Sequence, residues 1–165
     1  NKATDYVATP YDDTILEYNK KLNETYVTYN TMGREKMQLQ AEQDVNAKGY
    51  SNANAVSRTV SKSSHLYQNA TWDLIDASEG ETFKFEDLKQ DELPEVLKNK
   101  SKKEIKAYVS KKKEERKVIQ QKIQELNTNR KQYIKKQNKA ETNGLENAMI
   151  KAIKTQAKNK NYKWE

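Results

Sequence analysis

The stretch IKAYVSKKKEERKVIQQKIQELNTNRKQYIKKQ, residues 105–137, decides the fold of this chain because it has a helical rhythm with few apolar side chains. Its inward positions alternate at spacings of four and three, the repeat of a helix that packs along a narrow seam. Just before it, Ser101 and Glu104 form a capping box, which marks the start of a helix. We therefore predict a helix over residues 101–138, with this seam: Ile105, Val109, Lys112, Arg116, Ile119, Ile123, Leu126, Arg130, Tyr133 and Gln137.

The rest of the chain has a composition typical of an all-α protein. Glycine and proline are scarce, with four and two copies, and alternating β-branched patterns are nearly absent. Apolar and small residues at helical spacing predict helices over residues 11–28, 35–48, 52–77 and 144–158. We expect Gly144 to separate the last helix from the long one, and the acidic, aperiodic stretch 78–93 to form a crossover loop. In the last helix we expect these residues to face inward: Leu145, Met149, Ala152 and Ile153.

The length of the predicted helix 101–138 sets the expected architecture. A straight helix of this size is roughly 55 Å long, whereas a compact chain of this length is about 40 Å across. The predicted helix 52–77 has the same repeat and a seam of small residues, which suits close approach of a partner helix. We therefore expect a single domain over residues 1–165, an elongated helical bundle with a long antiparallel, coiled-coil-like hairpin. A homodimer through the same seam stays open.

The net charge of +7 is distributed unevenly along the chain. Residues 61–95 carry 3 basic and 9 acidic side chains, whereas residues 96–165 carry 21 and 7. A basic helical module that binds nucleic acid is one hypothesis, and it requires lysines gathered on one exposed face. Here the lysines circle the predicted helix and glutamates interrupt them. This pattern favours a solvated surface that the acidic segment partly neutralises.

No constellation in the sequence predicts a catalytic, cofactor or metal site. The chain has no cysteine, and its single histidine, His65, has no second ligand of metal-binding spacing. A hydrolase that uses Asp73 and Asp76 is a further hypothesis, although acid–base catalysis needs a pocket that shifts the pKa of such carboxyls. No apolar run reaches the roughly 20 residues of a membrane span. The first residues lack the apolar region of a signal peptide, which fits a cytosolic protein or a mature fragment.

Five segments carry a resemblance to a known group of proteins: TYVTY (25–29), QAEQDVNA (40–47), NATWDLIDA (69–77), LPEVL (93–97) and KKEIKAYVSKKKEERKVIQQKIQELNTNRKQYI (102–134). The chain resembles, from about residue 10 to residue 164, the region that follows the von Willebrand factor A domain in exported bacterial proteins, especially Bacteroidetes-like ones. The resemblance implies a periplasmic, cell-envelope or secreted location and a neighbouring A domain. It also implies that the metal-binding function of such proteins belongs to that domain.

The helix patterns and the resemblance together favour a non-enzymatic module with a structural or protein-interaction role. Its expected partner is the A domain in the same protein or another envelope protein. Polar residues in such helices usually form packing ion pairs and caps, and a few positions are candidates for a structural or interaction role. They are Gln43, Asp44, Arg58, Tyr67, Trp72, Asp73, Asp76, Arg116 and Arg130.

Overall fold

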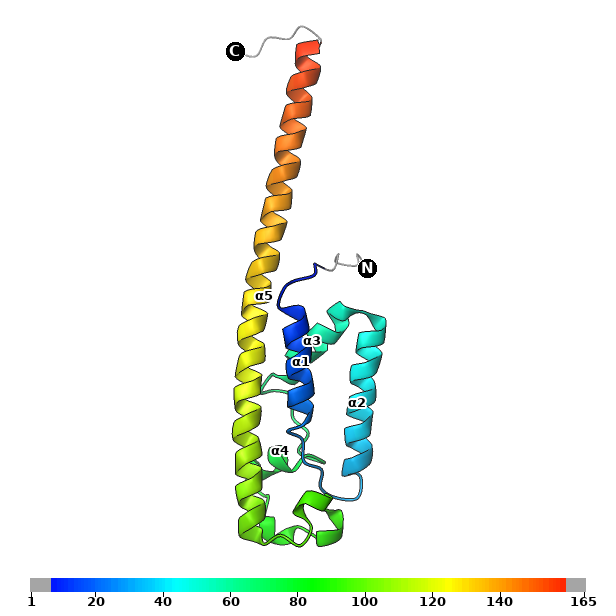
Figure 1. Cartoon of the computed structure of the whole chain (residues 1–165), viewed down its shortest axis with the longest axis vertical. Coiled ribbons are helices and arrows are strands. Elements are labelled where there is room, and N and C mark those ends of the chain that lie inside the picture. The colour runs from blue at the N-terminus through cyan, green and yellow to red at the C-terminus, as the bar shows by residue number, and fades with distance from the viewer. Residues whose placement is uncertain (1–6, 160–165) are drawn as a thin grey trace.

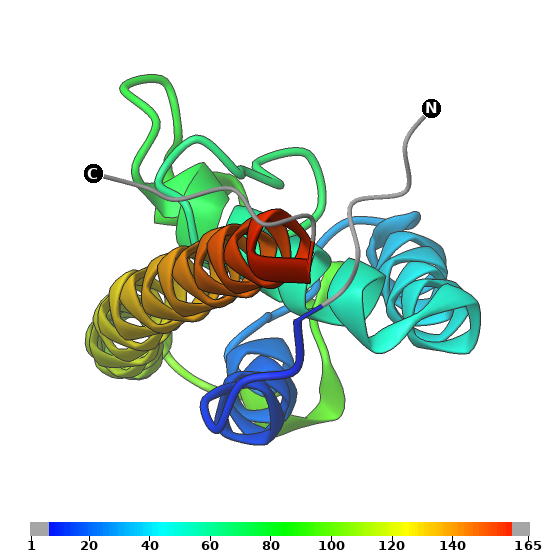
Figure 2. The same cartoon turned by 90° about the horizontal axis from the view of Figure 1, so that it is seen from above.

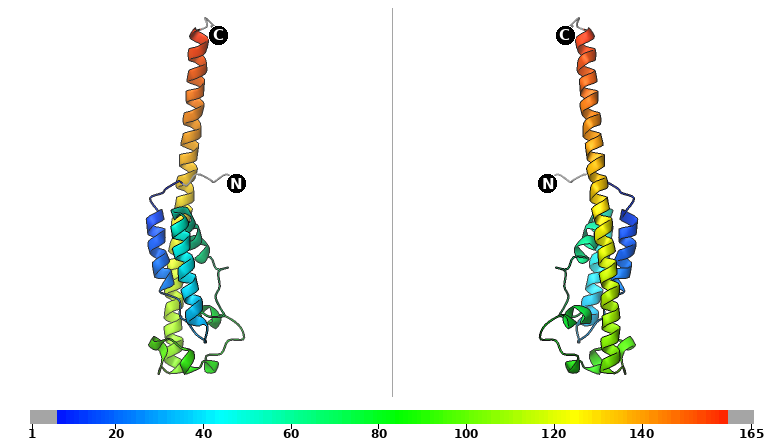
Figure 3. Two further views of the ribbon diagram at one scale, coloured as in Figure 1. Left: turned by 90° about the vertical axis from the view of Figure 1, so that its right-hand side faces the viewer. Right: turned by 90° about the vertical axis from the view of Figure 1, so that its left-hand side faces the viewer.

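The computed structural model describes residues 7–159, and over these residues the fold is all-helical, without a β-strand. The α-helices are α1 (Asp12–Asn23), α2 (Gly33–Tyr50), α3 (Asn52–Lys62), α4 (Leu74–Ser78) and α5 (Lys102–Asn159). Three single-turn 3-10 helices lie between α4 and α5: η1 (Phe85–Asp87), η2 (Gln90–Glu92) and η3 (Glu95–Leu97). The other helices gather beside the N-terminal half of α5, and no other described helix lies beside its C-terminal half (Figure 1, Figure 3).

The helix that lies antiparallel along α5 is α1. Asp12, at the start of α1, pairs with Arg130, whereas Thr25, just after its end, bonds to Arg116. Between these two contacts a core cluster fills the predicted seam of α5. Its buried residues are Ile15, Leu22, Tyr26, Val56, Trp72, Ile123 and Leu126. Val56 of α3 belongs to this core, and seen from above α3 lies between α5 and α2 (Figure 2).

The prediction of one helix over residues 52–77 is wrong. α3 ends at Lys62, and the chain then turns until α4 begins at Leu74. Serine hydroxyls compete for backbone groups, and the Ser63 hydroxyl donates to the Val60 carbonyl at the end of α3. Asp73 adopts extended backbone and forms an isolated antiparallel bridge with Thr28. The predicted hairpin between residues 52–77 and 101–138 is therefore not confirmed.

α1 is also shorter than the predicted helix 11–28. It ends at Asn23, the chain turns at Glu24 and Thr25, and the segment that follows contains β-branched Val27 and Thr28, which favour extended backbone. The N–H of Tyr29 donates to the Trp72 carbonyl at 3.1 Å, which ties this segment to the turn before α4. By contrast, α2 lies close to the predicted range 35–48, and the predicted loop 78–93 contains only the end of α4 and two 3-10 turns.

The expected break at Gly144 is wrong as well, because α5 continues through it to Asn159. No described glycine has a positive φ, so Gly144 is not the left-handed cap that ends many helices. A glycine inside a helix costs only about 0.5–1 kcal/mol, and good helix formers such as Glu141 and Leu145 flank it. Residues 135–156 are all exposed, so the side chains expected to face inward lie in solvent.

The start of α5 follows the capping prediction. The Ser101 hydroxyl accepts a hydrogen bond from the Glu104 N–H at 3.1 Å. A second core cluster packs the first turns of α5 against α4, η3 and the extended segment after α1. Its buried residues are Val27, Leu74, Ile75, Leu93, Leu97, Ile105 and Val109. The two core clusters hold α1, α3 and α4 against α5.

Candidate functional site

Arg116 is the centre of the most buried polar cluster on α5. Its guanidinium contacts both carboxylate oxygens of Asp73 (2.7 and 3.2 Å) and Oδ1 of Asp76 (3.0 Å). It also donates to the hydroxyl and the carbonyl of Thr25, each at 2.9 Å, and it lies 4.3 Å from the ring centroid of Tyr26. One side chain thus joins α5, α4 and the end of α1. The planar fork of arginine suits several fixed acceptors at once.

Asp73 is fully buried, and both of its carboxylate oxygens accept hydrogen bonds. Beyond Arg116, Oδ1 accepts from the Val27 N–H at 2.9 Å, and Oδ2 accepts from the Asp76 N–H at 3.1 Å. The second of these bonds caps the N-terminus of α4. Asp76 in turn accepts from the Asn69 N–H at 2.7 Å. The two carboxylates thus accept from Arg116 and from three backbone N–H groups, and the arrangement anchors three segments.

Electrostatics within this cluster act on two titratable neighbours. Burial, with the adjacent charge of Asp73, raises the pKa of Asp76 above its usual value despite the Asn69 N–H and the cation of Arg116. Burial also raises the pKa of the Tyr26 hydroxyl. The pKa of Arg116 is raised because bonding to Asp73 outweighs the effect of its own burial. The guanidinium is therefore charged throughout the accessible pH range.

Asp44 on α2 is the centre of a second cluster, which joins α2 to α1 and α3. Lys62 donates to Asp44 Oδ2 (2.7 Å), to Asn23 Oδ1 (2.6 Å) and to Asn19 Oδ1 (3.0 Å), and its side chain is fully buried. Arg58 Nε donates to the other oxygen of Asp44 at 2.6 Å. The three ammonium protons thus match three acceptors. Lys62, on α3, thereby connects this helix to α1 and α2.

The pKa shifts of this pair follow from burial and from its partners. Burial acts to raise the pKa of Asp44, but hydrogen bonds from Lys62, Asn23 and Arg58 outweigh it, so the pKa lies below its usual value. Burial lowers the pKa of Lys62, and Asp44 opposes this change without cancelling it. Asp44 therefore stabilises the folded chain as a carboxylate.

Except for Arg130, the remaining predicted candidates lie around these two clusters. Gln43 accepts a hydrogen bond from Arg58 at 3.1 Å, and Tyr67 donates to the side chain of Gln40 at 3.0 Å. Trp72 packs against the ring of Tyr26, with 5.5 Å between centroids. Arg130 stands apart from both clusters, at the far end of the α1–α5 seam, where its Nε donates to Asp12 at 2.9 Å. The structure thus gives each predicted candidate a packing contact between elements.

Three residues essential to these clusters were missed by sequence reasoning. Lys62 resembles an ordinary surface lysine, and its spacing of four from Arg58, which puts both on one face of α3, is the single local signal. Thr25 and Gln40 act through partners that are distant in the sequence. The pairing of Thr25 with Arg116 spans 91 residues, so local periodicity carries no information about it.

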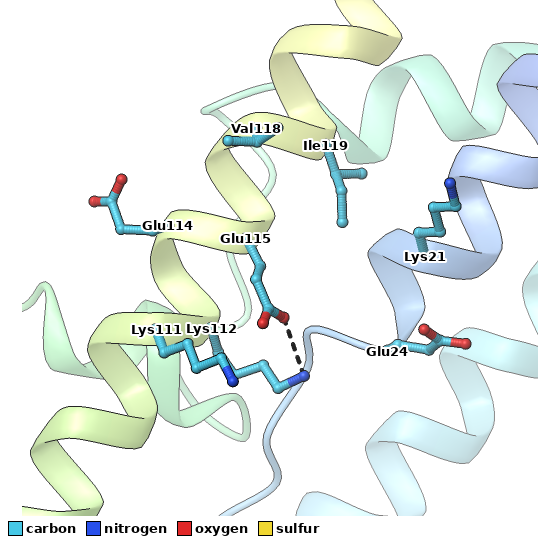
Figure 4. Close-up of a pocket in the computed structure, with 8 residues that line it drawn as sticks. All are labelled: Lys21, Glu24, Lys111, Lys112, Glu114, Glu115, Val118 and Ile119. Carbon is cyan, nitrogen blue, oxygen red and sulfur yellow. Dashed lines mark hydrogen bonds and ion pairs between the residues drawn. The ribbon is translucent and has the colours of Figure 1, made fainter.

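A groove of about 660 Å³ lies between α1 and α5 (Figure 4). Val118 and Ile119 form part of its wall, and Lys112 and Glu115 form an ion pair of 3.1 Å within it. Lys21 and Glu24 contribute charged groups from the α1 side. A second hollow, of about 690 Å³ and more polar, lies between the end of α3 and α5. His65 lines this hollow and is exposed, and neither of the two charge clusters opens into it.

The C-terminal part of α5 offers a different kind of surface. We call residues 131–159 the arm, because it begins directly after the Arg130–Asp12 ion pair and projects beyond the other helices (Figure 1). Several large apolar side chains on it are more than half exposed: Leu145, Met149, Ile150 and Ile153. A single helix cannot bury such side chains, so the arm presents them to solvent.

Two searches of the described residues bear on function classes. Within residues 7–159, no group of three or more histidine, cysteine, aspartate or glutamate side chains is arranged to hold a metal ion. Over the same range, no helix combines the length and the apolar character of a membrane-crossing segment. Comparisons with known protein families, with curated proteins and with solved structures found no match to this chain.

Proposed function

We propose that this chain is a non-enzymatic structural and protein-interaction module, accessory to a von Willebrand factor A domain in an exported bacterial protein. In this proposal the helices beside the first half of α5 form a rigid base. The arm then serves as the docking surface for a partner protein. The single observation that carries the proposal is the continuous helix α5, which leaves the base after Arg130 with its apolar side chains exposed.

The chemistry of the buried clusters supports the non-enzymatic part of the proposal. Asp73 and Asp76, the carboxyls that a hydrolase would need, accept their hydrogen bonds from the backbone and from Arg116. Asp73 has no exposed surface. Carboxylates bonded in this way hold the fold together, and fully buried Asp73 offers no surface to a substrate.

The position of α1 supports a role next to another domain. Because Asp12 pairs with Arg130, the chain enters α1 at the level where the arm leaves the base (Figure 1). A domain joined ahead of α1 is thereby held beside the arm. This arrangement raises the effective concentration of that domain at the docking surface.

Photo-cross-linking in the natural full-length protein, produced in its own cells, tests the proposal. A benzophenone amino acid replaces Met149 on the exposed apolar side or, as a matched control, Lys154 about half a turn round the helix. We expect the probe at position 149 to cross-link to one defined protein surface, in the A domain or in another envelope protein. Equal cross-linking at both positions, or none at position 149, would contradict the proposal.

The seven lysines of the arm favour nucleic-acid binding as a second candidate. Such binding uses lysines alone and weakens steeply as salt is raised. Titration of the chain with duplex DNA at two salt concentrations separates the two candidates. Substitution of the exposed apolar residues leaves DNA binding unchanged but abolishes docking of a protein.

A further inference from the structure

Apolar and basic side chains share one face of the arm in two separate halves. Leu145, Met149 and Ile153 are four residues apart, so they lie along one side of the helix, and their exposed fractions are 68%, 65% and 52%. Lys131, Lys135 and Lys139 each precede one of them by fourteen residues. Because fourteen residues are close to four helical turns, these lysines fall in line with the apolar side chains. We call this line of six residues the docking stripe.

The arm also holds most of the net charge of the protein. It contains seven lysines and two glutamates, which give +5, whereas the whole chain carries +7. All other residues together therefore carry only +2. In the base, lysines and arginines of α5 pair with acidic residues of other elements, as Lys106 does with Glu86 and Lys113 with Glu79. Among the described side chains, none of residues 131–159 forms an ion pair. The positive charge of the arm is therefore not neutralised by nearby acidic side chains.

We propose that the docking stripe binds an acidic amphipathic helix of a partner protein. The partner helix would present apolar residues opposite Leu145, Met149 and Ile153, and aspartates or glutamates opposite the three lysines. The stripe from Lys131 to Ile153 is roughly 33 Å long at about 1.5 Å per residue, so the partner helix needs about six turns. This inference rests on the proposed function and adds the chemistry of the partner.

Other occupants fit the stripe less well. A second copy placed parallel would set lysines against lysines, and an antiparallel copy would set lysines against apolar side chains. A membrane surface would draw the whole stripe toward the lipid, including three ammonium groups that lie on the same side as the apolar residues. Nucleic acid would pair with the lysines but leave the apolar half in water.

Binding of synthetic peptides to the full chain tests this chemistry. The probe is a helical peptide with three leucines spaced four residues apart and three glutamates on the same face, each fourteen residues from one leucine. It is made in two versions, with the glutamates before or after the leucines. Two comparison peptides carry lysine in place of the three glutamates, or serine in place of the three leucines. At 150 mM salt we expect the acidic peptide to bind at least tenfold more tightly than either comparison peptide, as measured by fluorescence anisotropy.

Variants of the arm show which half of the stripe acts. We expect the triple change Leu145→Ser, Met149→Ser and Ile153→Ser to weaken binding of the acidic peptide at least tenfold. Charge reversal at Lys131, Lys135 and Lys139 to Glu should weaken it similarly and create binding to the lysine peptide. The matched control reverses three lysines away from the stripe: Lys151→Glu, Lys154→Glu and Lys158→Glu. We expect this control to keep the affinity within threefold, with unchanged helicity.

Specific results would overturn the inference. They are equal loss in the control variant, tighter binding of the lysine peptide by the natural chain, stripe-dependent binding to vesicles with anionic phospholipid, or self-association through the stripe. If no peptide binds while the benzophenone probe at position 149 still cross-links to a protein, the acidic chemistry of the partner alone is refuted. Failure of cross-linking would refute the proposed function itself.

Discussion

Arg116 shows how a single polar residue organises this fold. Sequence periodicity placed it on the seam of the long helix, and the structure confirms that position. Its guanidinium is buried against Asp73, Asp76 and Thr25, none of which lies within the long helix. Buried arginines of this kind bring little net stability when paired, yet they are costly to break, because one charge is then left without a partner.

The change Arg116→Met should therefore destabilise the protein strongly. We expect a loss of about 3–5 kcal/mol in the free energy of unfolding, because fully buried Asp73 would lose the cation that bonds to both of its oxygens. Urea denaturation followed by circular dichroism measures this loss. The neighbouring change Lys117→Met, at an exposed position, is the matched control and should cost less than about 0.5 kcal/mol. A similar stability for both variants would show that the cluster around Arg116 does not hold the base together.

Asp44 gives the stability of the protein a dependence on acid pH. Its pKa in the folded chain lies below its ordinary value near 3.8, so the unfolded chain binds the proton more readily. The stability that Asp44 contributes is therefore complete above about pH 5 and is lost as pH falls through the lowered pKa. The pKa of Lys62 is lowered by burial, but acid keeps its ammonium charged, so Asp44 is the group of this pair that titrates as the pH falls.

Comparison of the natural chain with the variant Asp44→Asn tests this dependence. At pH 7 we expect the variant to be less stable by about 3 kcal/mol, because Lys62 would be buried without a counter-charge. Between pH 5 and pH 2 the difference should shrink, since the natural carboxyl becomes protonated. Asp76, whose pKa is raised, titrates in both proteins, so its effect cancels in the difference. A difference that stays constant down to pH 2 would contradict this role of Asp44.

At the scale of elements, long-range contacts decided where the sequence predictions failed. The strongly periodic helix at residues 101–138 and the all-helical class were predictable, because both depend on local spacing and composition. The sequence of segment 52–77 has apolar and small residues at regular helical spacing, but Asp73 adopts extended backbone, in which it bonds to the Val27 N–H and to Arg116. Contacts with Trp72 and Asp73 of the same segment hold residues 24–28 outside the first helix, which was predicted to extend to residue 28.

Gly144 provides a test of the continuity of α5. A Cβ at this position would meet no atom within 4 Å apart from the adjacent backbone of α5 itself, so the change Gly144→Ala should fit the helix without strain. We expect slower amide hydrogen exchange in residues 140–150, equivalent to about 0.5–1 kcal/mol of local stability. Faster exchange and lower helicity would instead indicate that Gly144 takes a left-handed conformation and ends a helix there.

At the scale of the whole molecule, the positions of the charges are as informative as the fold. The basic final third suggested by the sequence divides into two parts of different character. In the base, lysines and arginines of α5 face acidic residues from α4, η1 and the start of α1. The arm keeps its lysines exposed, with its apolar residues beside them. Sequence periodicity could not show this division, because it depends on where the other helices stop along α5.

Small-angle X-ray scattering of the full chain, with mass determination, tests the central claim that α5 projects from its base as a free arm. A helix of 58 residues is about 87 Å long at about 1.5 Å per residue. We predict a monomer of 19.2 kDa with a maximum dimension of roughly 90–100 Å, unchanged between low and high salt. A compact particle of about 50 Å would mean that the arm folds back on the base, and a dimer would mean that the docking stripe is filled by a second copy; either result would contradict the account.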